Sequence, residues 1–515
     1  MSNLDEQQRA DVVPSGGPTS SGGAPNWAEL AGRLNIDGRA VIDGERADAA
    51  AGRTFTSVNP ATNQPLADVV SGNADDVDRA VRAARRAFQD GDWSRSAAED
   101  RKAVLCRLAD LLDEHGDELA LLDSLEMGKP VAEARAVDVQ GTAATFRWYA
   151  EAIDKLIDEI PSTPPGSVAM VTREPVGVVG AIVPWNYPLE IAGWKLAPAL
   201  ALGNSVLLKP AAQSSLSVLR LADLALQAGL PRGVLNVLPG PGGSVGEAIG
   251  LHPDIDALSF TGSTAVAKRL LGYAGASNLK RLSLEAGGKS ANLVFADAED
   301  LAAAATKAAF GAFYNQGEVC SANSRLLVER SIYHDFVELL IEAAGDYLPG
   351  DPLSAASGTG SLVSAEHAED VWAAVQKGRV DGDLLHGGDR LEINGSQAFI
   401  TPTIVGGLQA SHQLLQEEVF GPLLTVVPFD AEDEAVGIAN STPYGLAASV
   451  WTSNLSRAHR VAGQLVAGTV SVNTVDALGV TTPFGGFKQS GFGRDLSLHA
   501  LDNYSAMKTT WIQFG

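Results

Sequence analysis

The sequence predicts an α/β protein in which parallel sheets are covered by helices. Three apolar runs at residues 176–183, 204–209 and 233–238 have the composition of buried strands, and helical stretches at about 214–228 and 243–250 separate the later ones. Strands that alternate with helices form a parallel sheet with helices on both faces. Such sheets bind ligands at the carboxyl ends of their strands, so the residues that follow these runs are the first functional candidates.

The segments on either side of these strands extend the pattern. Apolar residues recur at helical spacing over 77–88 and again over the longer segment 105–119, which predicts two amphipathic helices. A second alternating block of strands and helices runs from 290 to about 480. The final segment, 504–512, alternates like an edge strand and needs a partner strand, which indicates oligomerisation.

Composition bounds the class of protein. At 515 residues the chain is too long for one ordinary core, so two or three packed units are expected. Hydrophobic residues make up 45% and charged residues 19%, the balance of a folded globular protein. The formal net charge of -24 repels nucleic acid and anionic membranes, and neither is expected as a partner. Residues 1–25 are rich in Ser, Gly, Pro and acidic side chains and are predicted to be a disordered tail.

The sequence shows neither a targeting signal nor the spacing of a metal site. The first residues contain no apolar core, and no apolar stretch approaches the ~20 residues that span a bilayer, so a cytoplasmic location is expected. Two cysteines, Cys106 and Cys320, do not suggest a disulfide framework in a chain of this length. The eight histidines are scattered without ligand spacing, so no metal site is expected.

Cys320 is the first candidate for chemistry. It lies in a polar turn that follows an alanine-rich helical segment at 301–313. A cysteine that backbone amides can face fits an activated nucleophile. A lone cysteine is more often a small buried hydrophobe, at roughly four to one, and the nearby Glu318 is expected to raise the pKa of the thiol. Cys320 alone therefore leaves both interpretations open.

Two polar residues at strand ends are candidates to act with this thiol. Glu285 ends a predicted strand and is followed by two glycines, and it fits a general base. Asn186 follows the strongest strand, where its amide fits an oxyanion donor. An isolated glutamate is more often exposed in a turn, and Asn186 taken alone is part of a rigid turn.

A further group of residues fits a dinucleotide site. Lys209 closes the second strand within reach of a cofactor ribose, although a lone lysine usually faces solvent. Ser263 precedes a helical stretch whose N-terminal amides fit a pyrophosphate, and a plain N-cap explains the same spacing equally well. The glycine-rich run 240–246 misses the G-x-G-x-x-G fingerprint at Val245, which disfavours an ordinary Rossmann enzyme.

Six short motifs carry a family resemblance. They are Pro-Trp-Asn-Tyr-Pro at 184, Phe-Thr-Gly-Ser at 260, Leu-Glu-Ala-Gly-Gly-Lys at 284, Asn-Gln-Gly-x-x-Cys at 315, Glu-Glu-Val-Phe-Gly-Pro at 417 and Pro-Phe-Gly-Gly at 483. In this order they resemble the aldehyde dehydrogenase superfamily, over roughly residues 27–515. Within it, residues 147–154, 284–292 and 494–501 look most like γ-glutamyl-γ-aminobutyraldehyde dehydrogenases of putrescine breakdown.

The resemblance implies a domain plan. It consists of a Rossmann-like cofactor domain, an α/β catalytic domain and a small β bridging element that joins another subunit in a homodimer or homotetramer. We therefore expect an NAD(P)-binding domain at 26–153 and 176–286, a catalytic domain at 287–488 and an oligomerisation element at 154–175 and 489–515.

The resemblance also implies roles for the candidate residues. Cys320 attacks the aldehyde as a thiolate, and the Asn186 amide and the Cys320 backbone N–H hold the oxyanion. Hydride passes to NAD or NADP, and Glu285 activates the water that hydrolyses the thioester. Contacts to the cofactor are expected from Trp185, Lys209, Gly262, Ser263, Glu418 and Phe420, the last two at the nicotinamide ribose and ring.

Two positions depart from the family pattern. Members that prefer NAD commonly carry Glu three residues after the lysine, where it binds the adenosine ribose and repels a 2′-phosphate. Ala212 stands at this position, which predicts weakened selectivity for NAD and some use of NADP. The loop 475–480 beside the expected substrate mouth has Asp476 as its only acid, which leaves an amine-derived substrate in doubt.

Two other functions use the same residues differently. Acyl transfer to coenzyme A or ester hydrolysis would proceed through Cys320, but Glu285 argues against the coenzyme A reaction because a water-activating base would waste the thioester. A non-catalytic scaffold needs neither residue. We therefore expect an aldehyde dehydrogenase whose partner is a small-molecule aldehyde, γ-glutamyl-γ-aminobutyraldehyde or a related amino or aliphatic aldehyde.

Overall fold

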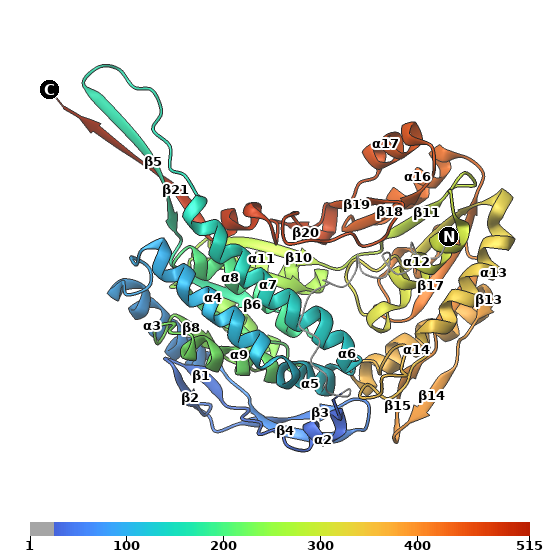
Figure 1. Cartoon of the computed structure of the whole chain (residues 1–515), viewed down its shortest axis with the longest axis horizontal. Coiled ribbons are helices and arrows are strands. Elements are labelled where there is room, and N and C mark those ends of the chain that lie inside the picture. The colour runs from blue at the N-terminus through green and yellow to red at the C-terminus, as the bar shows by residue number, and fades with distance from the viewer. Residues whose placement is uncertain (1–24, 515) are drawn as a thin grey trace.

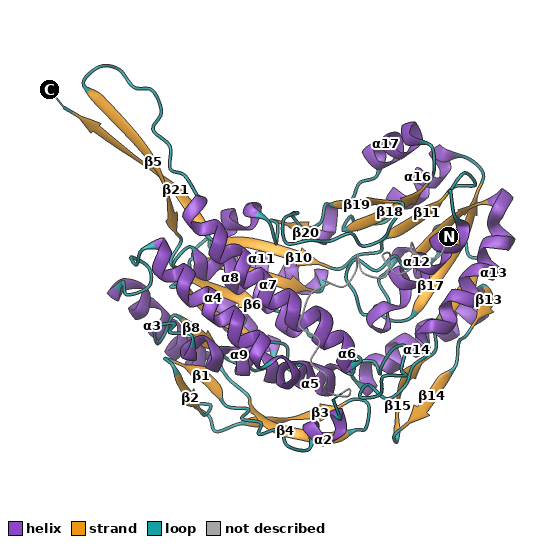
Figure 2. Ribbon diagram, viewed as in Figure 1, coloured by secondary structure: helices purple, strands orange, loops and turns teal. Residues whose placement is uncertain are grey.

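The computed structural model describes residues 25–514 and places most strands in two large sheets (Figure 1). The tail predicted over 1–25 lies outside the described residues apart from its last position. Both sheets are parallel at their centres and covered by helices, as the colouring by secondary structure shows (Figure 2). The predicted α/β class is confirmed.

The first sheet has eight strands, and its central strands run parallel. The pairs at its two ends are antiparallel: β2 with β1, β1 with β8, and β10 with β20. Three of the central strands, β6, β7 and β8, lie inside the three predicted runs. In spatial order the strands are β2 (Glu45–Ala47), β1 (Ala40–Ile42), β8 (Leu235–Val237), β7 (Ser205–Lys209), β6 (Val178–Ile182), β9 (Ala257–Gly262), β10 (Arg281–Ala286) and β20 (Gly491–Phe492).

Both faces of this sheet are buried because successive side chains point to opposite sides. Along β6, Val179 and Ala181 pack into one helical layer, and Val178 and Ile182 into the other. The first layer contains α4 (Ala98–Glu114), α5 (Gly116–Met127), α7 (Gln140–Ala152), α8 (Pro188–Ala201) and α9 (Leu216–Gln227). The second contains α3 (Ala74–Asp90), α10 (Glu247–Leu251) and α11 (Thr264–Ala276).

One predicted helix is divided in two. The segment 105–119 belongs partly to α4 and partly to α5, because His115 has φ −99° and ψ 17° instead of helical angles. The N–H of His115 donates to the carbonyl oxygen of Leu111, which ends α4, and Gly116, a weak helix former, begins α5. The prediction of one longer helix is wrong because the apolar spacing continues across the break.

The second sheet has seven strands, and all its pairs are parallel except the edge pair β13–β16. In spatial order they are β13 (Asp383–His386), β16 (Thr403–Gly406), β17 (Leu423–Phe429), β12 (Arg325–Glu329), β11 (Ala291–Val294), β18 (Ala447–Trp451) and β19 (Thr469–Val472). The helices around it are α12 (Leu301–Phe313) and α13 (Tyr333–Ala344) on one face, and α15 (Gln413–Gln416), α16 (Glu432–Asn440) and α17 (Leu455–Gln464) on the other. The sheet is thus buried on both sides.

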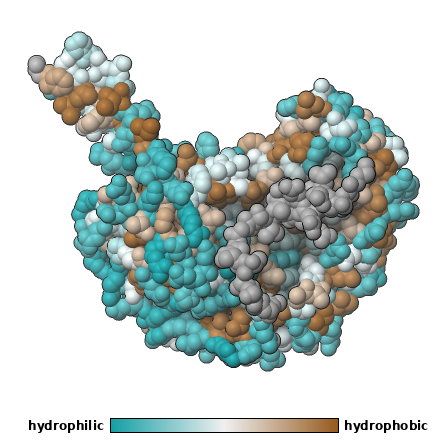
Figure 3. All heavy atoms as spheres, viewed as in Figure 1, coloured by the Kyte–Doolittle hydropathy of each residue, from teal (hydrophilic) through white to brown (hydrophobic). Residues whose placement is uncertain are grey.

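A long two-stranded arm projects from the body (Figure 1). Strand β21 (Ser505–Gln513) pairs antiparallel with β5 (Ser167–Pro175), and the register runs from Ser505 opposite Pro175 to Gln513 opposite Ser167. The predicted edge strand at 504–512 is therefore present, and its partner belongs to the same chain. Trp511 and Phe514 are among its exposed apolar side chains, and Figure 3 shows hydrophobic surface along the arm.

Smaller elements complete the described chain. Two hairpins join β3 (Thr54–Asn59) to β4 (Gln64–Val70) and β14 (Arg390–Ile393) to β15 (Ser396–Ile400). The remaining α-helices are α2 (Trp27–Ala31), α6 (Val131–Glu133) and α14 (Ala365–Asp381). No helix within residues 25–514 is long and apolar enough to cross a bilayer.

Candidate active site

Five of the site residues predicted from the sequence lie at the carboxyl edge of the first sheet. In the parallel register, Ile182 is opposite Lys209 and Ala286 is opposite Gly262, so these strand ends lie along one edge. The candidates at this edge are Trp185 and Asn186 after β6, Lys209 at the end of β7, Gly262 at the end of β9 and Glu285 near the end of β10.

Cys320 reaches this edge from a sharp turn between α12 and β12 of the second sheet. Asn315, Gln316 and Gly317 have φ values of 49°, 58° and 71°, so three consecutive residues adopt the left-handed region. A Cβ on Gly317 would lie 2.4 Å from the carbonyl oxygen of Gly421, so this close approach requires glycine. The turn ends the helix abruptly and brings Cys320 to the first sheet.

The side-chain amide of Asn186 is fixed against the same turn. Its Nδ2 donates to the backbone oxygen of Glu318 at 2.9 Å, and Asn315 Nδ2 donates to that oxygen at 3.0 Å. Asn186 is only 2% exposed. A primary amide carries two hydrogens, so this bond orients Nδ2 and leaves its second hydrogen for another acceptor near the nucleophile turn.

Two glycines after Glu285 allow the two sheets to meet. A Cβ on Gly288 would lie 2.4 Å from the carbonyl oxygen of Cys320, and one on Gly287 would lie 2.1 Å from a carboxylate oxygen of Glu418. The N–H of Gly288 donates to Glu418 Oε1 at 3.0 Å. Any larger side chain here would push Cys320 and Glu418 away from β10.

The carboxyl of Glu285 lies close enough to the thiol of Cys320 for each group to affect the pKa of the other, and burial raises the pKa of Glu285 to about 8. Burial also raises the pKa of the Cys320 thiol well above its usual value, and the carboxylates of Glu285, Asp476 and Glu418 act in the same direction. The Cys320 side chain is still partly exposed. The protonated thiol thus has a proton acceptor nearby and remains accessible.

Glu318 is not among the main causes of the raised pKa of the Cys320 thiol. Its carboxylate is completely buried, and Oε1 accepts the N–H of Val363 at 3.1 Å. The carboxylates that raise the pKa of Cys320 come from other elements. Proximity in sequence misleads here because the left-handed turn directs the Glu318 side chain toward the segment before α14.

A buried ion pair beside Glu285 was not found from the sequence. Lys195 Nζ, on α8, lies 2.5 Å from Asp495 Oδ2, and both side chains are at most 2% exposed. Lys195 lowers the pKa of Glu285 and Asp495 raises it, so the pair adjusts the proton affinity of this carboxyl. The available signal was a lysine within a mostly apolar helix, whose other charged residue is Glu190 in the first turn.

Aromatic side chains form the wall next to Glu418. The rings of Trp185 and Phe420 meet edge to face with centroids 5.2 Å apart, and His367 lies 5.4 Å from Trp185. Burial raises the pKa of Glu418 to about 7. Trp185, Glu418 and Phe420 are therefore brought together, and His367, on α14, joins them without having been predicted.

The remaining candidates lie further along the same edge. Lys209 is buried, its Nζ donates to the carbonyl oxygen of Pro210 at 2.7 Å, and burial lowers its pKa to about 8. Ser263 caps α11, with Oγ accepting the N–H of Val266 at 3.4 Å. Ala212 lies partly exposed in the turn after β7. The glycine-rich run forms a π-helical turn, Gly242–Gly246, ahead of α10.

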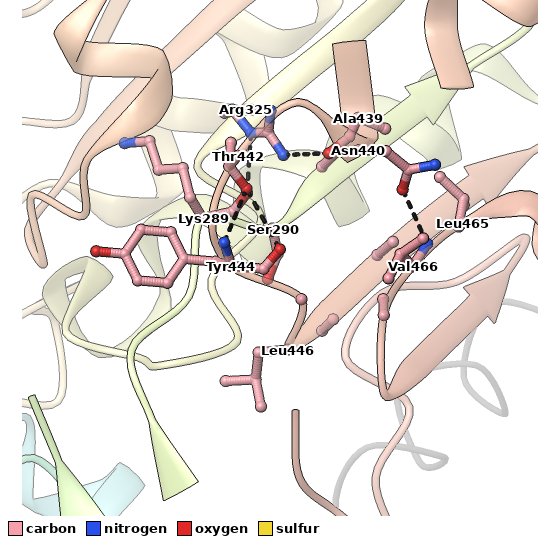
Figure 4. A pocket seen from close by; sticks show the side chains of 15 residues that line it. Lys289, Ser290, Arg325, Ala439, Asn440, Thr442, Tyr444, Leu446, Leu465 and Val466 are labelled. Atoms are coloured by element: carbon pink, nitrogen blue, oxygen red, sulfur yellow. Dashed lines mark hydrogen bonds between the residues drawn. The ribbon is translucent and has the colours of Figure 1, made fainter. Parts of the chain in front are cut away.

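A small cavity near Lys289 is separate from these groups (Figure 4). Its volume of about 10 Å³ is about the space of one water molecule. The guanidinium of Arg325 donates to the backbone oxygens of Lys289, Ile438 and Ala439 and so joins three segments of the chain. A cavity of this size admits neither an aldehyde nor a dinucleotide.

Tyr187, which follows Asn186, has acidic side chains from several elements near it, and the ammonium of Lys129, paired with Asp138, lies 3.9 Å from the centre of its ring. The charges of Asp138, Glu190 and Asp476 all contribute to raising the pKa of Tyr187, after burial. Asp476 Oδ1 accepts the hydroxyl of Ser321, next to Cys320, at 2.7 Å. The loop 475–480 thus supplies one of several acids near the nucleophile.

Comparisons with known proteins all point to one family. A model of the "Aldehyde dehydrogenase family" matches residues 47–510. The NADP/NAD-dependent aldehyde dehydrogenase PuuC of Escherichia coli is 51% identical over 94% of this chain and 98% of its own length. The aminoacetaldehyde dehydrogenase of Pseudomonas aeruginosa is 47% identical over the same shares of the two chains.

Solved structures agree with the fold over nearly the whole chain. A γ-glutamyl-γ-aminobutyraldehyde dehydrogenase from Burkholderia cenocepacia is 50% identical with a TM-score of 0.93, covering 95% of this chain and 99% of its own. An indole-3-acetaldehyde dehydrogenase from P. syringae, solved with NAD+, is 52% identical with a TM-score of 0.94 and the same coverage. The resemblance predicted from six motifs is confirmed, and this chain belongs to the aldehyde dehydrogenase family.

Proposed function

We propose that this chain oxidises aldehydes to carboxylic acids through a thioester on Cys320, using NAD and, less selectively than strict NAD enzymes, NADP. The observation that carries the proposal is the placement of a buried carboxyl, Glu285, beside the Cys320 thiol, with the Asn186 amide oriented against the same turn. An ionised carboxylate beside a thiol and an oriented amide form a nucleophile, a base and an oxyanion donor.

The first half of the reaction forms a bond between sulfur and carbon. Glu285 accepts the thiol proton, and the thiolate of Cys320 attacks the aldehyde carbon. The resulting oxyanion is held by the free Nδ2 hydrogen of Asn186 and by the backbone N–H of Cys320. The bound nicotinamide supplies the acceptor for the hydride that leaves the same carbon. The carbonyl group then re-forms as a thioester on Cys320.

The second half hydrolyses the thioester. Glu285 first releases the thiol proton to solvent, and the carboxylate then takes a proton from water while the oxygen attacks the thioester carbon. The tetrahedral oxyanion collapses, the carbon–sulfur bond breaks, and the carboxylic acid leaves. Lys195 favours the ionised form of Glu285 and Asp495 opposes it, which supports a carboxyl that gains and loses a proton near neutral pH.

The residues along the sheet edge fit a dinucleotide. The N-terminal amides of α11, capped by Ser263, suit a pyrophosphate, and Gly262 directly precedes this cap. Lys209 and Glu418 provide an amine and a carboxyl for ribose hydroxyls; Lys209 is buried, and Glu418 is partly exposed. Trp185 and Phe420 suit the flat nicotinamide ring.

Ala212 supports use of both cofactors. An acidic side chain at the ribose end hydrogen-bonds the 2′-hydroxyl of NAD and repels the 2′-phosphate of NADP. Alanine does neither, so the described turn after β7 provides no such discrimination. The E. coli relative carries both cofactors in its name. We infer a ratio of kcat/KM for NAD over NADP below about a hundredfold, which corresponds to roughly 2.7 kcal/mol.

We further propose that the preferred substrates are small aldehydes with an amino group. Asp138 near Tyr187 is paired with Lys129, which leaves Glu190 and Asp476 as the acids that favour a cationic substrate, and two relatives are named for amine-bearing aldehydes. The test compares kcat/KM for 3-aminopropanal and for butanal, which has nearly the same size. We expect the amine to be preferred by about tenfold or more, and Asp476→Asn with Glu190→Gln to reduce the preference. Equal values, or preference for indole-3-acetaldehyde, would exclude the amine.

The direct test of the thiol mechanism is absorbance of the reduced nicotinamide when the protein meets propanal with NAD or NADP. Cys320→Ala should abolish turnover and retain cofactor binding, because no second nucleophile replaces it. Cys106→Ala is the matched control, since Cys106 is also free and partly exposed but lies on α4. Residual turnover of Cys320→Ala within tenfold of wild type would refute the mechanism.

Acyl transfer and a non-catalytic scaffold are less well supported. A base that activates water beside the thioester would compete with coenzyme A, and Glu285 lies near enough to raise the pKa of the thiol. A scaffold needs neither the buried Glu285 nor the Lys195–Asp495 pair next to it. Burial of these charges is costly for stability, which favours a catalytic use.

The arm supports assembly of identical subunits into dimers or tetramers. Its strands leave outer edges without partners within the described residues, and Met507, Trp511 and Ile512 are each more than two-fifths exposed. A cytoplasmic location is supported by Cys106 and Cys320, both free thiols, which suit a reducing compartment. Light scattering after size-exclusion chromatography tests the assembly.

A further inference from the structure

Phe420 has an unusual backbone conformation that needs support. Its φ of 58° lies in the left-handed region, which a bulky side chain rarely adopts. The carbonyl oxygen of Phe420 lies 2.7 Å from Nε2 of His367. A carbonyl only accepts, so Nε2 carries the hydrogen and donates it. His367 therefore holds the backbone of the residue proposed to contact the nicotinamide.

His367 is itself fixed in place. It lies in the first turn of α14, and its backbone N–H donates to Oγ of the capping residue Ser364 at 3.1 Å. Its ring meets Trp185 edge to face at 5.4 Å, and Trp185 in turn meets Phe420 at 5.2 Å. The imidazole thus supports the aromatic wall by packing and by a hydrogen bond.

The same imidazole faces the nucleophile turn. His367 Nε2 lies 3.6 Å from Glu318 Oε1, and that oxygen also accepts the N–H of Val363 at 3.1 Å. Glu318 precedes Cys320 by two residues, and its backbone oxygen accepts Asn186 Nδ2. Glu318 therefore faces His367 of the cofactor wall with its side chain, and the oxyanion donor Asn186 with its backbone carbonyl.

We propose that His367 and Glu318 are positioning residues that hold Phe420 and the Asn186 amide in a fixed relation, so that the nicotinamide wall and the oxyanion donor are set together. The proposal rests on the roles proposed above for Asn186 and Phe420. Neither His367 nor Glu318 touches the reacting atoms. Loss of the hydrogen bond from His367 to Phe420 should affect cofactor binding, and loss of the 3.6 Å contact between His367 and Glu318 should affect turnover through Asn186.

Two variants separate the hydrogen bond from the ring. His367→Phe keeps a ring but cannot donate, and His367→Gln can donate but has no ring. We expect His367→Phe to raise the KM for NAD and lower kcat by about fivefold each, and His367→Gln to recover most of both losses. His334→Leu, at an exposed histidine on α13, is the control and should match wild type. Equal losses in the Phe and Gln variants would overturn the hydrogen-bond role.

A double-mutant cycle tests the connection to Asn186. In an Asn186→Ala background, His367→Phe should lower kcat by less than about twofold while still raising the KM for NAD. Additive losses in kcat would overturn the connection. Titration of the protein with NAD, followed by tryptophan fluorescence, measures the affinity for the cofactor in the absence of turnover. An unchanged kcat in Asn186→Ala alone would instead refute the proposed oxyanion role. Melting curves show whether each variant is folded. If His367→Phe is misfolded, His367→Leu replaces it.

Discussion

Replacement of Glu285 by glutamine should remove the pH dependence of thioester hydrolysis. With a pKa of about 8, the Glu285 carboxyl is about half ionised at pH 8 and about 1% ionised at pH 6. Hydrolysis in the wild type should therefore be about fifty times faster at pH 8 than at pH 6. Glu285→Gln should lack this rise and be slower at pH 8 by a factor of about 10² to 10⁴.

The assay is stopped-flow absorbance of the reduced nicotinamide with saturating propanal and NAD, in which the steady rate after the first turnover reports hydrolysis. Glu126→Gln is the matched control. Glu126 is also buried with a pKa raised to about 8, but it lies on α5 and accepts hydrogen bonds from Ser57 and Leu216. A flat wild-type profile between pH 6 and pH 8, or a retained fiftyfold rise in Glu285→Gln, would refute the reasoning.

The same pKa has a consequence for stability. The folded chain raises the pKa of Glu285 above its ordinary value of 4.5, so between pH 4.5 and about 8 the folded state binds this proton more tightly than the unfolded state. The contribution of Glu285 to stability is therefore greatest at low pH and falls as the pH rises through this window. Glu285→Gln should gain melting temperature relative to wild type at pH 9 and gain less at pH 5.

Three further variants test other parts of the site and the arm. Asn186→Ala should lower kcat by about a hundredfold in steady-state assays because an oxyanion donor is lost, and an unchanged kcat would remove Asn186 from the mechanism. Ala212→Glu should raise the ratio of kcat/KM for NAD over NADP by about tenfold or more, and a wild-type ratio already above about a hundredfold would contradict the cofactor prediction. Trp511→Asp should shift the assembly toward monomers by light scattering, and an unchanged mass would mean that the arm does not join subunits.

The strand ends were the most predictable part of the molecule. Each of β6, β7 and β8 reads as a short apolar run, and a parallel sheet brings the polar residues after such runs to one edge. Asn186, Lys209 and Glu285 could therefore be expected close together before any contact was known. The glycines after Glu285 also signalled a close approach, which in the structure is to Cys320 and Glu418.

Pairings between distant segments could not be predicted. Lys195 and Asp495 meet only because the segment after β20 folds back against α8, and no local pattern marks Asp495 as its partner. His367 lies in an ordinary polar helix start, and its role depends on the left-handed backbone of Phe420. The contacts of Glu318 could not be predicted either, because the direction of its side chain depends on the turn before Cys320.

The strand β20 has a consequence for how the protein is made. Gly491 pairs opposite Glu285, and Asn204 Nδ2 donates to the carbonyl oxygen of Tyr504, so segments that emerge late from the ribosome close the edge and the base of the first sheet. At ordinary rates of synthesis, about 10 to 40 s separate β10 from β20. During that interval the edge of β10 beside Glu285 is open. A ribosome that stalls between the two strands would release a chain without this cover, and such a chain should be recognised by chaperones before it can act on an aldehyde.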